Sequence, residues 1–495
     1  DRQSIRSQNH HTRAAVSSRH TLPIFAMDAD SSSSPLRVVV VPWLAFGHLL
    51  PYLELSERLA ERGHSVSYVS TPRNLARLPP LRPAAAPRVD LVALPLPRVD
   101  GLPDGAESTN DISYSDRKFH WKAFDGLAAP FAEFLAAACA DEATRPHWII
   151  ADCFHHWATA AALDHKVPLA MLQPTAASVA ASLRPPSVQP DASVVEEQPA
   201  AAARAVPRYE REGHAALITG HGASSGGMSV IQRFILTKDR CTVAAMRSCI
   251  EWEPESFPLA ETLLGKPVIP LGLLPPSADG ARRAAAQGAE HATVRWLDAQ
   301  PPDSVIYVAL GSEVPLREEQ VRELAIGLEL AGTRFLWALR KPIGADDDPL
   351  PPGFQDRTSG RGMVTTGWVP QMSILAHAAV GGFLTHCGRN SLIESLLFGH
   401  PLVMLPIYGD QGPNARQMAA KQVGLQVARN QDDGSFDRHG VSSAVRAVMV
   451  DEETRRGFVA GAAKMQAVVA DTELHDRYID EFVEHLRSCA AASAN

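Results

Sequence analysis

The chain has 495 residues, of which 45% are hydrophobic, and a formal net charge of −8. This length suits two to four domains with sizeable cores. Because acidic and basic residues are interspersed, no basic surface of the kind that nucleic acids require is expected, and we expect no nucleic-acid partner.

Membrane and secretion signals are missing from the sequence. No apolar run reaches the about 18 residues of a membrane helix, and residues 1–34 lack the apolar core of a signal peptide. Their polar composition predicts a disordered leader, with folding beginning at Pro35. The six cysteines show neither CxxC pairs nor zinc-type spacing. They are expected to be reduced structural thiols in a cytoplasmic protein without a membrane partner.

The first folded segment reads as strand, helix and strand. Residues 36–43 are a continuous β-branched run, as in a buried parallel strand, and residues 51–64 have apolar positions at helical spacing. A second strand is predicted at 65–71, which completes a βαβ unit. Further short strands are predicted at 147–154 and 168–174, with Ala-rich helices around them.

A polar stretch then separates this series from a second α/β series, which opens with a strand at 303–312, a helix at 317–332 and a strand at 334–340. The prediction is two Rossmann-like, doubly wound α/β domains facing a cleft, with ligands beyond the carboxyl ends of the strands. The expected organisation is a disordered leader (1–34), an N-terminal α/β domain (35–274), an interdomain linker (275–292), a C-terminal α/β domain (293–469) and a final helix packing back on the N-terminal domain (470–495).

The segment 383–399, FLTHCGRNSLIESLLFG, reads as a strand, a tight turn and a helix. Gly388 would let the backbone approach a ligand closely, and Asn390 and Ser391 have side chains suited to capping. Exposed N–H groups and the helix dipole favour an anion there. On this segment alone, an ordinary capped helix after a strand remains the alternative.

The wider segment, residues 368–411, is more specific, because it reads WVPQMSILAHAAVGGFLTHCGRNSLIESLLFGHPLVMLPIYGDQ. It resembles the signature box of the plant family-1 UDP-glycosyltransferases, from the opening Trp-x-Pro-Gln to the closing Asp-Gln. The resemblance extends over about residues 36–488. Stretches such as LPLPRVDGLPDGAEST look especially like the cereal branch-forming β-1,2-glucosyltransferases that add glucose to the sugars of steviol glycosides.

This resemblance implies the GT-B type of fold, with acceptor bound by the N-terminal domain and UDP-sugar by the C-terminal domain. It implies inverting transfer of glucose from UDP-glucose to a hydroxyl of a small molecule, namely a sugar hydroxyl of a terpenoid (steviol-type) or flavonoid glycoside. UDP-sugar and a small hydrophobic glycoside would be the partners of a monomer. Neither a metal nor another cofactor is expected, and no DxD-like carboxylate pair stands in the expected place.

The resemblance also implies which residues contact the donor. Trp368 would stack on uracil, Gln371 would bond the nucleoside, and Glu394 would accept from the ribose hydroxyls. Other members of the set would hold the diphosphate and the sugar hydroxyls. The expected donor-binding residues are Ser312, Trp368, Val369, Gln371, His386, Gly388, Arg389, Asn390, Ser391, Glu394, Asp410 and Gln411.

Arg389 departs from the family pattern, which has Trp at this place in the box. An arginine would either add a charged donor to a phosphate or swing to solvent and leave a wall of the sugar site open. In the second case the chain would be a UDP-sugar binder with weakened catalysis.

The expected chemistry of transfer lies in the N-terminal domain. His48 follows the first strand at the start of a helix, whose N-terminus disfavours imidazolium and so favours a neutral base. A simple helix cap is the alternative. The resemblance assigns His48 as the general base and Asp152 as its acidic partner. His155 and His156 are adjacent and cannot line one side of a strand, so we favour pocket wall or packing over metal binding.

Aromatic residues of the acceptor pocket are harder to predict, because each is equally suited to plain core packing. The candidates for its wall are Trp43, Phe46, Phe124, His155, Trp157 and Phe398.

Two other assignments differ from a glucosyltransferase in the reaction or in the donor. A dinucleotide-dependent oxidoreductase lacks support, since no G-x-G-x-x-G follows the first strand. The same chemistry with UDP-rhamnose or UDP-xylose as donor remains open.

Overall fold

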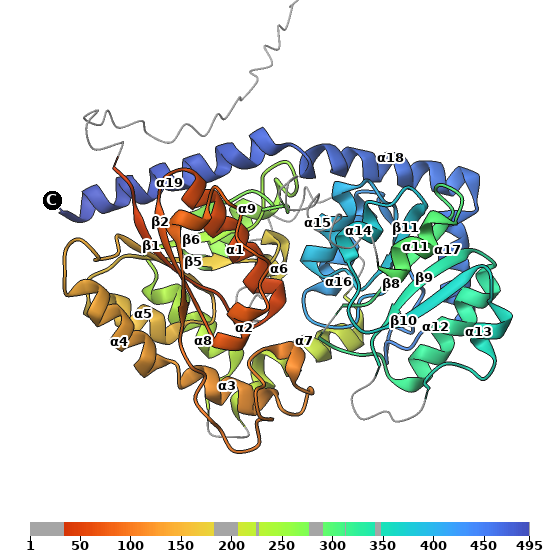
Figure 1. Cartoon of the computed structure of the whole chain (residues 1–495), viewed down its shortest axis with the longest axis horizontal. Coiled ribbons are helices and arrows are strands. Elements are labelled where there is room, and N and C mark those ends of the chain that lie inside the picture. Colours follow the sequence, from red (N-terminus) through yellow and green to blue (C-terminus); the bar gives the residue numbers. More distant parts are fainter. Residues whose placement is uncertain are drawn as a thin grey trace, which may run out of the picture. The chain divides into compact units, whose positions relative to one another are not determined.

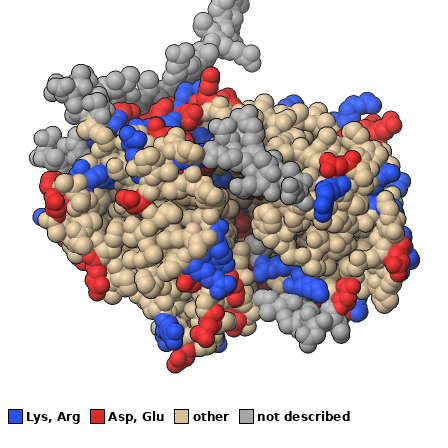
Figure 2. Space-filling view, in the orientation of Figure 1, with Lys and Arg blue, Asp and Glu red and all other residues tan. Residues whose placement is uncertain are grey.

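The computed structural model describes residues 34–182, 206–223, 227–276, 291–311, 313–341 and 348–494. Residues 1–33 of the expected leader and Ser312 lie outside these ranges, as does most of the expected linker. Figure 1 shows the strands of two sheets with helices around each. Figure 2 shows positive and negative side chains interspersed over the face in view.

The first sheet has seven parallel strands in the order β3-β2-β1-β4-β5-β6-β7. Its strands are β1 (Arg37–Val41), β2 (Ser65–Ser70), β3 (Val89–Ala93), β4 (Trp148–Asp152), β5 (Leu169–Gln173), β6 (Val243–Met246) and β7 (Val268–Pro270). The helices of this half are α1 (Phe46–Glu61), α2 (Pro72–Ala76), α3 (Arg117–Asp125), α4 (Ala128–Cys139), α5 (His156–Asp164), α6 (Ala177–Ser182), α7 (Arg208–Ala223), α8 (Val230–Arg240) and α9 (Ser256–Leu264).

The second sheet has six parallel strands in the order β10-β9-β8-β11-β12-β13. Its strands are β8 (Val305–Ala309), β9 (Arg334–Leu339), β10 (Gly362–Thr366), β11 (Val380–Thr385), β12 (Leu402–Met404) and β13 (Gly424–Gln426). The remaining helices are α11 (Ala292–Asp298), α12 (Glu318–Ala331), α13 (Phe354–Arg357), α14 (Gln371–Leu375), α15 (Arg389–Leu397), α16 (Gln411–Ala420), α17 (Arg438–Met449), α18 (Glu452–Val469) and α19 (Thr472–Ala494).

Both sheets are covered on both faces, which explains why their strands read as continuous apolar runs. In β1, Val39 and Val41 belong to one buried core cluster, whereas Val38 and Val40 belong to another on the opposite face. In β8 the odd-numbered and even-numbered residues divide in the same way. This alternation follows from the two-residue period of a strand.

Strand order places two switch points, where the order reverses and neighbouring crossovers leave on opposite sides. In the first sheet the switch lies between β1 and β4, and in the second between β8 and β11. The segments that follow these four strands carry most of the predicted site residues, as expected for a doubly wound sheet.

Two helices begin ahead of their predicted starts. The helix α1 begins at Phe46, ahead of the predicted residue 51, so His48 lies in its first turn. The helix α15 begins at Arg389, and its cap, Gly388, forms no side-chain capping bond. Pro51 lies inside α1 and cannot donate to the carbonyl of Gly47 four residues earlier, which instead accepts from the Asn390 amide.

The last two helices pack on different parts of the fold. The helix α18 contacts α15 and α17, and α19 contacts β7 (Figure 1). Ile479 and Phe482 of α19 belong to the same buried cluster as Val38 of β1. The indole N–H of Trp148 donates to the main-chain oxygen of Leu486 at 3.0 Å.

Candidate functional site

A cavity of about 920 Å³ lies at the carboxyl ends of both sheets. Its lining comes from the segments that follow β1, β3, β4 and β5 of the first sheet and β8, β9, β10, β11 and β12 of the second. The location agrees with the general rule for ligand sites in open parallel sheets. The single cavity therefore brings together side chains from both halves of the chain.

His48 and Asp152 meet at the switch point of the first sheet. The His48 ring nitrogen Nδ1 lies 2.6 Å from Asp152 Oδ2, and the two side chains are 20% and 0% exposed. Because β1 and β4 are neighbours with Val41 paired to Ala151, the residues that follow these strands leave the sheet side by side. Neutral His48 would donate Nδ1–H to the carboxylate and keep Nε2 as a proton acceptor.

The electrostatics of this pair differ from the predicted effect of the helix N-terminus. Burial would lower the pKa of His48, but the adjacent Asp152 carboxylate outweighs it and holds the pKa above the ordinary value of 6.5. The pKa of Asp152 is lowered, since His48 opposes the effect of burial. The Cys153 thiol donates to Asp152 Oδ1 at 3.4 Å, which fixes the second oxygen of the carboxylate.

The turn between β11 and α15 is shaped by a close approach of His386 to two glycines. A Cβ atom on Gly388 would lie 2.4 Å from His386 Nε2, and one on Gly311 would lie 2.6 Å from it. Cys387, between His386 and Gly388, has a backbone φ of 66°, which residues other than glycine seldom adopt. Gly388 was predicted to let the backbone approach a ligand, but the group that lies against it in the structure is the imidazole of His386. Burial lowers the pKa of His386 to about 4, so this ring is neutral.

Arg389 is among the residues that line the cavity, but its guanidinium does not extend to solvent. Its side chain is 5% exposed and points toward the segment after β6. One terminal nitrogen donates to the Arg247 main-chain oxygen at 3.0 Å and to Ser248 Oγ at 3.3 Å. The guanidinium lies over the Trp252 ring, 4.9 Å from its centre, and 3.9 Å from Glu253. Its Nε and Nη1 find no partner among the described residues.

The expected nucleoside residues form a connected chain. Gln371 Nε2 donates to Glu394 Oε2 at 2.7 Å, and Tyr307 donates its hydroxyl to Gln371 Oε1 at 3.2 Å. Burial raises the pKa of Glu394. Trp368 is 76% exposed at the edge of the cavity, as an aromatic plane available for stacking must be. Val369 lines the cavity beside it.

The closing Asp-Gln pair begins α16. Asp410 Oδ2 accepts from Asn414 Nδ2 at 3.0 Å, and burial raises the Asp410 pKa. Gln411 Oε1 accepts from the main-chain nitrogens of Ile407 and Tyr408 at 2.8 and 2.9 Å. Gln411 can therefore offer its amide nitrogen to a ligand. Both Asp410 and Gln411 line the cavity. Asn390 and Ser391 line it as well.

Only part of the predicted aromatic wall borders the cavity. Trp43 and Phe46 line it. Phe124, His155 and Trp157 are not among the lining residues, because they pack on one another, with ring centres 4.9 to 5.3 Å apart. Phe398, at the end of α15, packs against the core of the second sheet. Aromatic residues that the sequence analysis did not single out complete the wall: Trp121, Phe154 and Phe234.

A polar bridge joins the two halves at the cavity, and the sequence analysis missed it. Arg117 donates to the Tyr408 hydroxyl at 2.7 Å and lies 3.6 Å from Glu313. Glu313 also accepts from the Thr109 hydroxyl at 3.1 Å, and Arg340 donates to the Asn110 main-chain oxygen at 3.1 Å. These residues come from segments that are distant in sequence, so no local pattern marks them.

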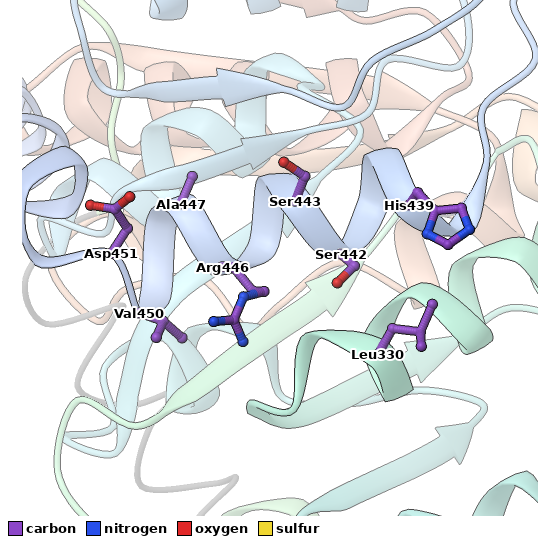
Figure 3. Close-up of a pocket in the computed structure, with 8 residues that line it drawn as sticks. All are labelled: Leu330, His439, Ser442, Ser443, Arg446, Ala447, Val450 and Asp451. Carbon is purple, nitrogen blue, oxygen red and sulfur yellow. The ribbon is translucent and has the colours of Figure 1, made fainter.

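A second hollow, of about 680 Å³, lies on α17 away from this site. Figure 3 shows Leu330 of α12 opposite His439, Ser442 and Arg446 of α17. None of the predicted site residues lines it. Among the described residues, no group of three or more His, Cys, Asp or Glu is placed to hold a metal ion. Across the same residues, no helix combines the length and apolarity needed to cross a membrane.

Comparison with known proteins identifies relatives over nearly the whole chain. Residues 270–459 match the family model described as UDP-glucoronosyl and UDP-glucosyl transferase. The chain is 38% identical to UDP-glycosyltransferase 91C1 of Arabidopsis thaliana, over 94% of this chain and 100% of that protein. It is 38% identical to UDP-glycosyltransferase 91D2 of Stevia rebaudiana (93% and 96%) and 35% identical to the soyasaponin III rhamnosyltransferase of Glycine max (95% and 99%).

Solved structures show the same fold. Arabidopsis thaliana UGT89C1, complexed with UDP-L-rhamnose, superposes with a TM-score of 0.70 at 23% identity, over 92% of this chain and 100% of that one. Glycyrrhiza uralensis UGT73P12, complexed with glycyrrhetinic acid 3-O-monoglucuronide, gives 0.72 at 20% identity, over 93% and 98%. The predicted fold of two Rossmann-like sheets of the GT-B type is thereby confirmed. By its whole-length relatives, the chain belongs to the plant UDP-glycosyltransferases of family 1 and is a UDP-dependent glycosyltransferase.

Proposed function

We propose that this enzyme transfers glucose from UDP-glucose, with inversion, to a sugar hydroxyl of a small terpenoid (steviol-type) or flavonoid glycoside. The observation that carries the proposal is the single cavity, which is lined both by His48 and by the donor motif of α15 and α16. Its apolar wall, with Trp43, Trp121 and Phe154, suits a hydrophobic aglycone. The closing Gln411 also supports glucose, because the resemblance associates a glutamine at this position of the signature box with UDP-glucose as donor.

In the proposed mechanism, His48 removes the proton from the acceptor hydroxyl through Nε2. The freed oxygen attacks the anomeric carbon of UDP-α-glucose, the bond to the diphosphate oxygen breaks, and UDP leaves with the electron pair. The N-terminus of α15 and nearby donors stabilise the charge that develops on the leaving diphosphate. Asp152 stabilises the imidazolium that forms. The product is a β-glucoside, and the scheme uses no metal.

The remaining assignments are part of the same proposal. The acceptor would bind to an N-terminal domain (35–274), and the UDP-sugar to a C-terminal domain (293–469) joined by the linker 275–292. The protein would act as a cytoplasmic monomer.

A matrix of donors and acceptors, with mass spectrometry of the products, tests this function. We expect the highest turnover with UDP-glucose and a terpenoid or flavonoid glycoside, and less with the matching aglycone. A second candidate is UDP-rhamnose as donor, which the similarity to a rhamnosyltransferase favours. Transfer only to aglycones, or no transfer with UDP-glucose, would contradict the first proposal.

The pH profile gives a separate test of the His48–Asp152 pair. Because a base must be neutral and the pKa of His48 is raised by Asp152, kcat/KM of the native enzyme should fall as the pH drops through a value above 6.5. In Asp152→Asn the raising charge is gone and burial dominates. The acidic limb should then move to lower pH, and the plateau rate should be reduced. An unchanged limb would make Asp152 a structural residue.

A further inference from the structure

Arg247 is a buried cation that no sequence pattern marked. It follows β6, and its side chain is 3% exposed. Nε donates to the Leu273 main-chain oxygen at 2.7 Å, and one terminal nitrogen lies 3.3 Å from the Leu274 oxygen. The other terminal nitrogen donates to the side-chain oxygen of Asn390 in the first turn of α15. Arg247 thus connects the first sheet to the donor motif of the second.

This contact determines how the Asn390 amide is oriented. A guanidinium is only a donor, so the atom of Asn390 that faces Arg247 must be the carbonyl oxygen. The amide nitrogen then points the other way, and it lies 3.5 Å from the Gly47 oxygen, next to His48. Pro51 lacks the N–H that would bond this carbonyl within α1. Asn390 therefore presents its amide N–H groups, one of which donates to the Gly47 oxygen, and not its side-chain oxygen on this side.

The charge of Arg247 is only partly balanced, because the Glu394 and Glu54 carboxylates act to raise its pKa but do not outweigh burial. Its three described acceptors are neutral, and among the described residues no carboxylate forms an ion pair with it. The neighbouring Arg389 has Glu253 at 3.9 Å. Burial and the nearby Arg389 lower the Arg247 pKa to about 9. A buried charge is costly without a partner, and beneath the N-terminus of α15 the natural partner is an anion.

We propose that Arg247 is a positioning residue for the UDP-sugar. It holds the Asn390 amide with its N–H groups toward the diphosphate, and its charge reinforces the N-terminus of α15 from the side away from the ligand. Arg247 does not line the cavity and so acts through Asn390. This inference rests on the proposed donor-binding role of Asn390.

Paired substitutions test the coupling. Arg247→Met removes the charge and the hydrogen-bond donors while keeping a side chain of similar length. It should weaken UDP binding, measured by calorimetry, by about tenfold, and it should raise KM for UDP-glucose by about the same factor. The same change in an Asn390→Ala background should cost much less. Arg247→Lys, which keeps the charge, should recover part of the affinity. Equal losses in both backgrounds would overturn the inference.

A matched control separates positioning from folding. Arg58 is also buried, donates to the Pro275 oxygen at 3.2 Å and, like Arg247, does not line the cavity, but it forms an ion pair with Glu54 at 2.7 Å. Arg58→Met should lower the melting temperature without changing KM for UDP-glucose. If it raises KM as much as Arg247→Met does, the effect of Arg247 is merely structural.

Asn390→Asp keeps the inference testable if Arg247→Met does not fold. The carboxylate would pair with Arg247 and preserve the fold, but it would present an oxygen where the amide presents N–H groups. UDP binding should be weaker than in Asn390→Ala. Binding equal to the native protein would overturn the inference. If Asn390→Ala itself leaves UDP affinity and KM unchanged, both the proposed donor-binding role of Asn390 and this inference are wrong. If Arg247→Met alone leaves them unchanged, this inference is wrong but the donor-binding role of Asn390 is retained.

Discussion

His48→Ala is expected to lower turnover at least about a hundredfold, which is the usual contribution of a positioned general base. UDP affinity should be nearly unchanged, because the residues proposed to hold the nucleotide belong to the second sheet. Release of UDP under saturating substrates measures the first quantity, and calorimetry with UDP measures the second.

The control for this variant is His439→Ala, which removes a histidine of α17 that lines the separate hollow and not the cavity. It should keep native turnover. If His48→Ala also keeps most of its activity, the Asp152 contact is structural and another group must take the proton.

Arg389→Trp is expected to raise both turnover with UDP-glucose and stability. The present side chain buries a guanidinium with two unpartnered nitrogens, and replacing buried ions by apolar groups is often stabilising by about 1–4 kcal/mol. Trp would supply a rigid wall beside the donor sugar. Since a misplacement of about 1 Å can cost a hundredfold, we expect turnover to rise about tenfold, with UDP affinity little changed.

The competing effect is that Arg389 is the cation nearest Glu253. Glu253 keeps other donors, because the main-chain nitrogens of Ala177 and Ser178 and the Gln417 amide lie 2.8 to 3.0 Å from its oxygens. These should hold the carboxylate after the cation is lost. Arg389→Met, which removes the charge without building the wall, should gain stability but not turnover. Equal or lower turnover in Arg389→Trp would show that the arginine serves the donor site.

The sequence predicts best those site residues that lie at or just after the carboxyl end of a strand. The continuous apolar run of β1 located the segment with His48, and the run of β4 located Asp152, but the pairing of these strands depends on sheet order, which no local pattern encodes. The family resemblance supplied that link. The predicted direction of the His48 pKa was wrong, because the pKa is raised by the contact with Asp152 at 2.6 Å, which outweighs burial and which the helix N-terminus alone did not reveal.

Other features depended on packing between distant segments. Phe124 and Trp157 were as suited to a pocket wall as to a core, and only the packed structure separates these outcomes. Arg247 stands directly after a buried strand, so a charge at the carboxyl end of β6 was a usable signal. Glu313 and Tyr408 had no such signal, because their roles arise from contacts across the cavity.

The docking of α19 on the first sheet has a consequence for how the protein is made. Ile479, Phe482 and Leu486 complete the apolar core around β1, yet they are synthesised after every strand of both sheets. At about 5–20 residues per second, this face of the nascent first half stays uncovered on the ribosome for on the order of ten seconds after β7 emerges. Completion of the first half therefore waits for the end of translation, and products truncated before α19 are expected to aggregate.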